Sequence, residues 1–169
     1  MGEQLVLKAR NDQARRNALG RDAEARAVAL NRVCELQRVA RLRRLFPECY
    51  GAPGKMTPKA AADADYYGCM LDGSARAVLV ECKHVDGERF SFANLREPQQ
   101  KALEALDAAG GVAVVLVVAT GRDYALPWWL VRDLLARDLA NVRLDALGEY
   151  RVIPGDAYLA RWARKGGVR

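Results

Sequence analysis

Residues 65–83 carry the sequence DYYGCMLDGSARAVLVECK, and this stretch decides the expected fold. Its centre holds Asp72-Gly73, a dipeptide typical of the tight turn that joins two antiparallel strands. Aromatic and β-branched residues, which favour strands, lie on both sides of that turn. The stretch therefore predicts a β-hairpin with strands over residues 65–71 and 76–85.

The second strand of this hairpin carries charged side chains on one face. Because successive side chains of a strand point to opposite faces, Glu81 and Lys83 share a face, while Cys82 points to the other. Hairpin pairing can bring Asp65, at the start of the first strand, beside them. Such groups are rarely buried unless they are paired or bind a metal, so the pattern predicts either a functional site or an exposed cross-strand ion pair.

The functional alternative is a metal-dependent site that hydrolyses phosphodiesters. The carboxylates of Asp65 and Glu81, with the backbone carbonyl of Cys82, supply the oxygen ligands that Mg²⁺ prefers, and Mn²⁺ can substitute for it. Mg²⁺ keeps some of its waters and takes phosphate oxygens from a substrate. Lys83 would orient or help to deprotonate the attacking water and offset negative charge in the transition state.

The remaining sequence predicts elements that complete one α/β domain over residues 1–169. Residues 12–44 lack proline and space their apolar residues as a helix does, although Gly20 can divide this segment into two helices. Residues 112–119 are continuously apolar, which predicts a central strand buried on both faces. The element order predicts a small mixed sheet flanked by helices. The other expected elements are a flexible basic arm over 1–11, a loop or projection over 51–62, a helix from Glu97-Pro98 to Gly110-Gly111, an edge or irregular strand over 124–131, and helices over 132–141 and 155–164.

The net charge of +6 divides into regions of opposite sign. Residues 1–62 and 151–169 together carry +11, whereas residues 63–150 carry −5. Basic regions around an acidic centre suit a protein that binds a polyanion such as DNA and concentrates carboxylates at one place. A solvated surface with a basic tail is the plainer alternative. The candidate DNA contacts are Lys55 and Lys59 in the 51–62 segment, together with Arg15, Arg16 and Arg89.

The composition excludes several other kinds of site and location. His84 is the only histidine, which excludes a nuclease that needs two. The 4 cysteines form no CxxC pair, so we expect buried thiols in a reducing compartment and neither a zinc module nor a disulfide scaffold. No apolar run reaches about 18 residues and no secretory signal pattern is present. We therefore expect a cytoplasmic protein without membrane association.

The order of these motifs resembles that of the PD-(D/E)XK nucleases. Asp65 followed by Glu81-Cys82-Lys83 matches their D…E-x-K pattern, although Ala64 stands where a proline usually precedes the aspartate. Within that superfamily the chain is similar to Holliday junction resolvases of the RecU and Hjc types, over about residues 17–135. The further matching motifs are Asp65-Tyr66-Tyr67-Gly68, Arg89-Phe90, Asn94-Leu95, Gln99, the Gly110-Gly111 pair before an apolar strand, and the G-x-x-x-E spacing of Gly20 and Glu24.

The resemblance implies a restriction-endonuclease-like fold, with a central mixed β-sheet flanked by helices. It implies that Asp65 and Glu81 bind the metal and that Lys83 is the catalytic lysine. Glu24 would reach the site from its helix as a ligand to the same metal or a second one. Gln99, at the start of the following helix, would hold the site or contact the scissile phosphate.

The resemblance also implies a homodimer that uses Mg²⁺ to cut four-way DNA junctions with paired symmetric nicks. One alternative is another PD-(D/E)XK endonuclease, of the restriction or repair type, that acts on duplex DNA. Another is a non-catalytic DNA-binding protein with the same fold. Two residue assignments also have competitors, because Asp63 lies close to Asp65 and Gln100 is adjacent to Gln99.

Overall fold

The computed structural model describes residues 20–46, 49–50, 57–58 and 63–165. The central sheet contains β1 (Ala40–Arg44), β4 (Tyr66–Met70), β5 (Ala77–Val85), β7 (Val112–Ala119) and β8 (Arg122–Pro127). Helices lie on both faces of this sheet: the helix over residues 20–36, α2 (Glu97–Ala108), α3 (Trp128–Ala136) and α4 (Ala160–Lys165).

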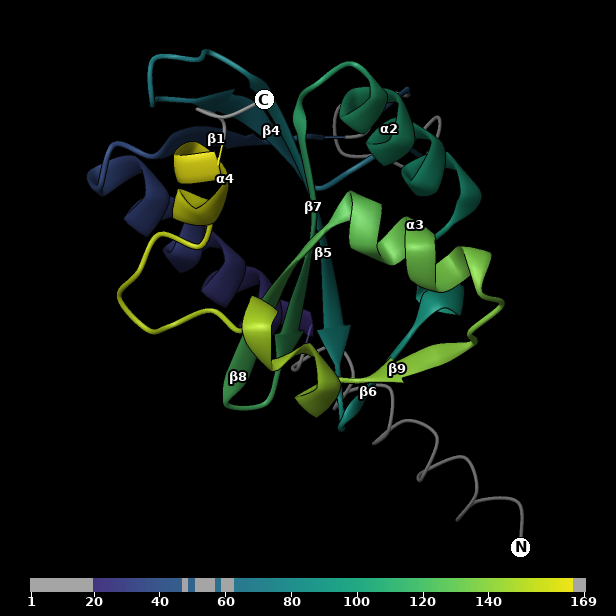
Figure 1. The fold of residues 1–169 in the computed structure, drawn as a ribbon. Coiled ribbons are helices and arrows are strands. Elements are labelled where there is room, and N and C mark those ends of the chain that lie inside the picture. Colours follow the sequence, from purple (N-terminus) through teal and green to yellow (C-terminus); the bar gives the residue numbers. More distant parts are fainter. Residues whose placement is uncertain (1–19, 47–48, 51–56, 59–62, 166–169) are drawn as a thin grey trace, which may run out of the picture.

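The strand order is β1-β4-β5-β7-β8, in which β5 and β7 are parallel and the other neighbours are antiparallel. The helix over 20–36 and α4 lie on one side of the sheet, and α2 and α3 lie on the other (Figure 1). The predicted α/β class, with a central mixed sheet flanked by helices, is confirmed.

The predicted hairpin is present as β4 and β5, which pair in antiparallel register. Side chains that alternate along β5 enter two separate cores. Val78 and Val80 pack with the helix over 20–36, whereas Leu79 packs with the core that includes Leu103 of α2. β7 is buried on both faces over its whole length, as its apolar sequence predicts. The hairpin thus places Glu81 and Lys83 toward α2 and Cys82 toward the opposite layer.

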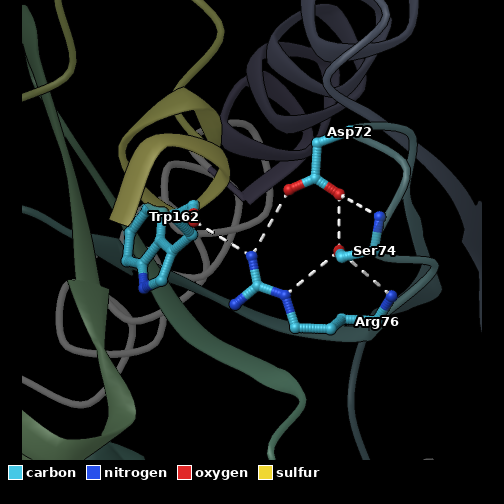
Figure 2. A network of polar contacts seen from close by, with 4 residues as sticks. All are labelled: Asp72, Ser74, Arg76 and Trp162. Atoms are coloured by element: carbon cyan, nitrogen blue, oxygen red, sulfur yellow. Dashed lines mark hydrogen bonds and ion pairs between the residues drawn. The ribbon is translucent and has the colours of Figure 1, made fainter. Parts of the chain in front are cut away.

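The turn of this hairpin is connected to α4 by a network of polar contacts (Figure 2). The carboxylate of Asp72 accepts hydrogen bonds from the hydroxyl and the backbone N–H of Ser74, at 2.5 and 3.0 Å. Arg76 donates to the Ser74 hydroxyl at 3.2 Å and to the backbone carbonyl of Trp162 at 3.0 Å. These contacts fix the end of the hairpin against the last described helix.

The predicted helix over 12–44 is wrong at its C-terminal end. The helix ends at residue 36, Arg38 adopts a positive φ of 56°, and residues 40–44 form β1 instead. Arginine and leucine favour helices, but pairing with β4 buries Ala40 and packs Leu42 against the core, and this tertiary gain outweighs the local preference. The predicted part over 12–19 lies outside the described residues.

The boundary between the predicted strand over 124–131 and the predicted helix over 132–141 is wrong. β8 ends at Pro127, and α3 begins one residue later. Trp128 is buried, and its indole N–H donates to Glu104 Oε2 at 2.5 Å, which docks the first turn of α3 against α2. The predicted edge position is confirmed, since β8 is the last strand of the sheet.

Two short strands have no counterpart among the predicted elements. β6 (Arg89–Ser91) and β9 (Asn141–Arg143) pair in antiparallel register. Because β9 occupies its last residue, the predicted helix over 132–141 is also too long at its C-terminal end. Both strands have only three residues, which is too short for an alternating pattern to be recognised in the sequence.

Two further segments differ from their predicted form. Within the predicted loop over 51–62, Thr57–Pro58 form β3, which pairs with β2 (Cys49–Tyr50). The last helix was expected over 155–164, but α4 begins only at Ala160. The rest of the 51–62 segment and the arm over 1–11 lie outside the described residues. None of the helices in the described part of the chain is both long and apolar enough to cross a membrane.

Gly68 lies where β1 and β4 approach each other most closely. A Cβ atom at this position would overlap the backbone carbonyl oxygen of Arg41, and a backbone atom cannot rotate away as a side chain can. We expect Gly68→Ala to lower the free energy of unfolding by roughly 3 kcal/mol, measured by denaturant unfolding. Gly148→Ala is the control, because no atom lies within 4 Å of the added Cβ. Equal stabilities of the two variants would contradict the close packing of β1 on β4.

Candidate active site

Asp65 is held against the second strand of the hairpin. It directly precedes β4, and its backbone N–H donates to the carbonyl of Val80 at 3.1 Å. Its carboxylate accepts a hydrogen bond from the backbone N–H of Cys82 at 2.7 Å. The aspartate is thereby fixed beside the Glu-Cys-Lys segment of β5, as the hairpin pairing predicted.

Glu81, Lys83 and Gln99 form a connected cluster on the α2 side of the sheet. The Lys83 ammonium lies 2.6 Å from Glu81 Oε1 and donates to Gln99 Oε1 at 3.1 Å. The Gln99 side-chain amide in turn donates to Glu81 Oε1 at 2.5 Å. Each of the three side chains therefore contacts the other two, and their relative positions are fixed without any ligand.

Gln99 is positioned by the beginning of α2. Its Oε1 also accepts the backbone N–H of Arg96, the residue that caps this helix. Gln100, the neighbouring candidate, donates instead to the carbonyl of Leu95 at 2.8 Å. The structure therefore brings Gln99, and not Gln100, into contact with Glu81. Asp63, the competitor of Asp65, is exposed.

Glu81 is an ionisable group in an unfavourable place. Its residue is 1% exposed, and burial, followed by the nearby charge of Asp65, raises its pKa to about 7, although Lys83 acts in the opposite direction. Its second oxygen, Oε2, is buried and has no hydrogen-bond partner among the described residues. A buried carboxylate with an oxygen that lacks a hydrogen bond lowers the stability of the folded protein, unless a cation or a hydrogen-bond donor contacts that oxygen.

A cavity of about 270 Å³ opens beside Asp65. Lys83 contributes to its lining from β5, and Glu24 contributes from the helix over 20–36. Glu24 forms an ion pair with Arg44, the last residue of β1, which also lines the cavity. Glu24 is thus brought near Asp65, as expected, but its carboxylate is directed to an arginine. The other lining residues are Gly20, Ala23, Tyr66, Cys82, His84 and Val118.

The oxygen atoms at this site suit a Mg²⁺ ion that takes few of its ligands from the protein. Within the described residues, no three His, Cys, Asp or Glu side chains gather closely enough to hold a metal ion on their own. Asp65 and Glu81 would therefore need the carbonyl of Cys82, water and substrate oxygens to complete the coordination, which is how Mg²⁺ is usually bound. The unbonded Oε2 of Glu81 supports this fit, since a cation would satisfy it. The role of Glu24 as a metal ligand stays a prediction.

The predicted DNA contacts are only partly within the described chain. Arg89 lies exposed in β6 and donates to Asn141 Oδ1 of β9 at 2.7 Å, outside the cluster around Glu81. Two arginines near the site were not predicted from the sequence: Arg44, on a strand expected to be helical, and Arg96, just before the Glu97-Pro98 signal. The remaining candidates, Arg15, Arg16, Lys55 and Lys59, lie outside the described residues.

No protein-family model matches this chain, and no curated protein matches it either. The function of the site is therefore inferred from its geometry and from its motif pattern.

Proposed function

We propose that this protein is a metal-dependent endodeoxyribonuclease that resolves four-way (Holliday) DNA junctions by phosphodiester hydrolysis, leaving paired symmetric nicks. The observation that carries the proposal is the buried carboxylate of Glu81, held by Lys83 and Gln99 next to Asp65. Burial of a carboxylate raises its pKa and lowers the stability of the folded protein. Groups with such perturbed pKa values concentrate at functional sites. The D…E-x-K pattern and its resemblance to the resolvases supply the reaction and the substrate.

The side chains of the cluster divide the work in this mechanism. Asp65 and Glu81, with the carbonyl of Cys82, would hold Mg²⁺ or Mn²⁺. The ion, when bound, stabilises negative charge on the phosphate and favours deprotonation of the attacking water. Lys83 contacts Glu81 and is one of the residues that line the cavity, and in this mechanism its positive charge would offset the negative charge that develops on the phosphate. Gln99 is a positioning residue that holds the side chains of Glu81 and Lys83 in place through hydrogen bonds to both.

The arrangement of the elements supports a restriction-endonuclease-like fold as part of this proposal. The helix over 20–36, the β4–β5 hairpin, α2 and the parallel strand β7 follow one another in the order that the resemblance implies. Asp65 directly precedes β4, Glu81 lies in β5, and Gln99 comes from the helix that follows. A homodimer completes the proposal, because two symmetric nicks in a two-fold junction need two equivalent sites.

Incubation with three DNA substrates of the same sequence, in Mg²⁺, tests the proposal. A labelled four-way junction, a linear duplex and a splayed duplex are compared on a denaturing gel. We expect paired nicks in the junction alone, because shape and backbone contacts, without base readout, would select the substrate. Cleavage of the linear duplex would favour the restriction or repair alternative. Binding without cleavage in both Mg²⁺ and Mn²⁺ would favour the non-catalytic alternative.

A further inference from the structure

A second group of side chains shares a sheet face with Glu81. The strand registers pair Arg43 of β1 with Tyr67 of β4, and Tyr67 with Leu79 of β5. Leu79 precedes Glu81 by two positions, so the two project from the same face of β5. The row formed by Arg43 and Tyr67 therefore lies one step, about 7 Å along the strands, from the row of Glu81.

None of the helices in the described part of the chain packs on this part of the sheet face, and its side chains are exposed. Among the helices, α2 packs on β5 and β7, and Tyr67 on β4 remains 49% exposed. Arg41 and Arg43 are also exposed, and alternation along β1 places both on the face opposite to Leu42, which packs against the core beneath the helix over 20–36. The exposed surface formed by Arg41, Arg43 and Tyr67 thus lies next to the row of Glu81 and extends to β1, the edge strand of the sheet.

The positive charges of this surface favour binding of a polyanion. Arg43 makes no ion pair with any described residue, whereas the Arg41 guanidinium lies 3.5 Å from Glu35 Oε1, near the end of the helix over 20–36, so Arg43 is the principal cation of this surface. Arginine presents several N–H groups in a planar fork that matches phosphate oxygens, and tyrosine also contacts DNA backbones. The carboxylates of Asp65 and Glu81 near these residues would repel DNA, so neighbouring arginines would offset that repulsion.

We propose that Arg41, Arg43 and Tyr67 bind the sugar-phosphate backbone of the DNA strand that enters the active site, next to the cleaved phosphate. This inference rests on the proposed function and names the surface of the chain that receives its substrate. The contact is made to phosphates and sugars, so it contributes affinity and positioning without sequence preference.

Fluorescence anisotropy with a labelled four-way junction tests the surface separately from the chemistry. Binding is measured in Ca²⁺ at several NaCl concentrations for the full-length wild type, Arg43→Ala, Arg43→Lys and the double variant Arg41→Ala/Arg43→Ala. We expect Kd to rise roughly tenfold for Arg43→Ala and roughly a hundredfold for the double variant, with the slope of log Kd against log salt falling by about 1 per arginine. Arg43→Lys should recover much of the affinity.

Arg137→Ala is the matched control, because Arg137 is exposed at the end of α3 and, among the described residues, forms an ion pair with its neighbour Asp133 alone. It should bind as the wild type does. Wild-type affinity and salt slope in the double variant would overturn this inference, while junction cleavage by that variant would leave the proposed function intact. A wild type that binds no DNA would overturn both. A wild type that binds but never cleaves would overturn the nuclease alone, and the loss of binding in the arginine variants would still support the surface.

Discussion

Replacing Lys83 by alanine should abolish junction cleavage while leaving junction binding nearly intact. Lys83 touches Glu81 and lines the cavity beside Asp65, where the proposed mechanism requires one positive charge, and it is not part of the exposed surface proposed to hold the DNA. Removal of one preorganised group that stabilises transition-state charge commonly costs a factor of about 100–1,000 in rate, and we expect a loss at the upper end. Single-turnover cleavage and anisotropy binding, on the same protein preparation, separate the two effects.

Lys101→Ala is the control for this experiment. Lys101 lies exposed on α2, and its one ion pair within the described chain is with Glu97, one helical turn away. It removes the same charge from a nearby element without touching the cluster, so its cleavage rate should equal that of the wild type. If Lys83→Ala instead lost binding in parallel with cleavage, Lys83 would be a DNA contact and the assignment of the catalytic cluster would be wrong.

Replacing Glu81 by glutamine should stabilise the metal-free protein at neutral and alkaline pH. The folded-state pKa of Glu81 is raised to about 7 from its ordinary value of 4.5, so ionisation is harder in the folded state than in the unfolded state. Stability is therefore lost as the pH rises from 4.5 to 7 and stays low above that range. Glutamine keeps the shape and carries no charge, so Glu81→Gln should gain up to about 3 kcal/mol at pH 8 and little at pH 4.

Thermal and denaturant unfolding in EDTA across this pH range provide the measurement. Glu97→Gln is the matched control, since Glu97 is exposed, and it should follow the wild-type curve. Millimolar Mg²⁺ should raise the Tm of the wild type but not that of Glu81→Gln, because binding to the folded state alone stabilises it. A Glu81→Gln variant less stable than the wild type at pH 8 would show that the ionised carboxylate is fully satisfied by Lys83 and Gln99.

The hairpin and its catalytic candidates could be predicted because local signals and tertiary structure agree there. Asp72-Gly73 marks the turn, and alternation along 76–85 places Glu81 and Lys83 on one face. The choice between Gln99 and Gln100 could not be made from the sequence, because a one-residue shift on a helix rotates the side chain by about 100°. Only the docking of α2 on β5 decides it.

The arginine surface could not be predicted, because it depends on β1, a strand whose residues favour a helix. Residues 40–44, ARLRR, have the composition of a helix and directly follow one, so β1 was not expected. Arg41 and Arg43 share a face with Tyr67 only once β1 pairs with β4. The start of α3 is a similar case, since the aromatic pair after Pro127 favours a strand locally, whereas burial of Trp128 against α2 stabilises a helix.

The most direct test of the central claim is a cleavage time course of a four-way junction by the wild type and Asp65→Asn in Mg²⁺. Asparagine preserves the size of Asp65 and its ability to accept the Cys82 N–H, but it removes the negative charge proposed to bind the ion. We predict paired nicks at symmetric positions for the wild type and none for Asp65→Asn, with equal junction binding. Cleavage by Asp65→Asn at the wild-type rate, or wild-type cleavage that persists in EDTA, would contradict it.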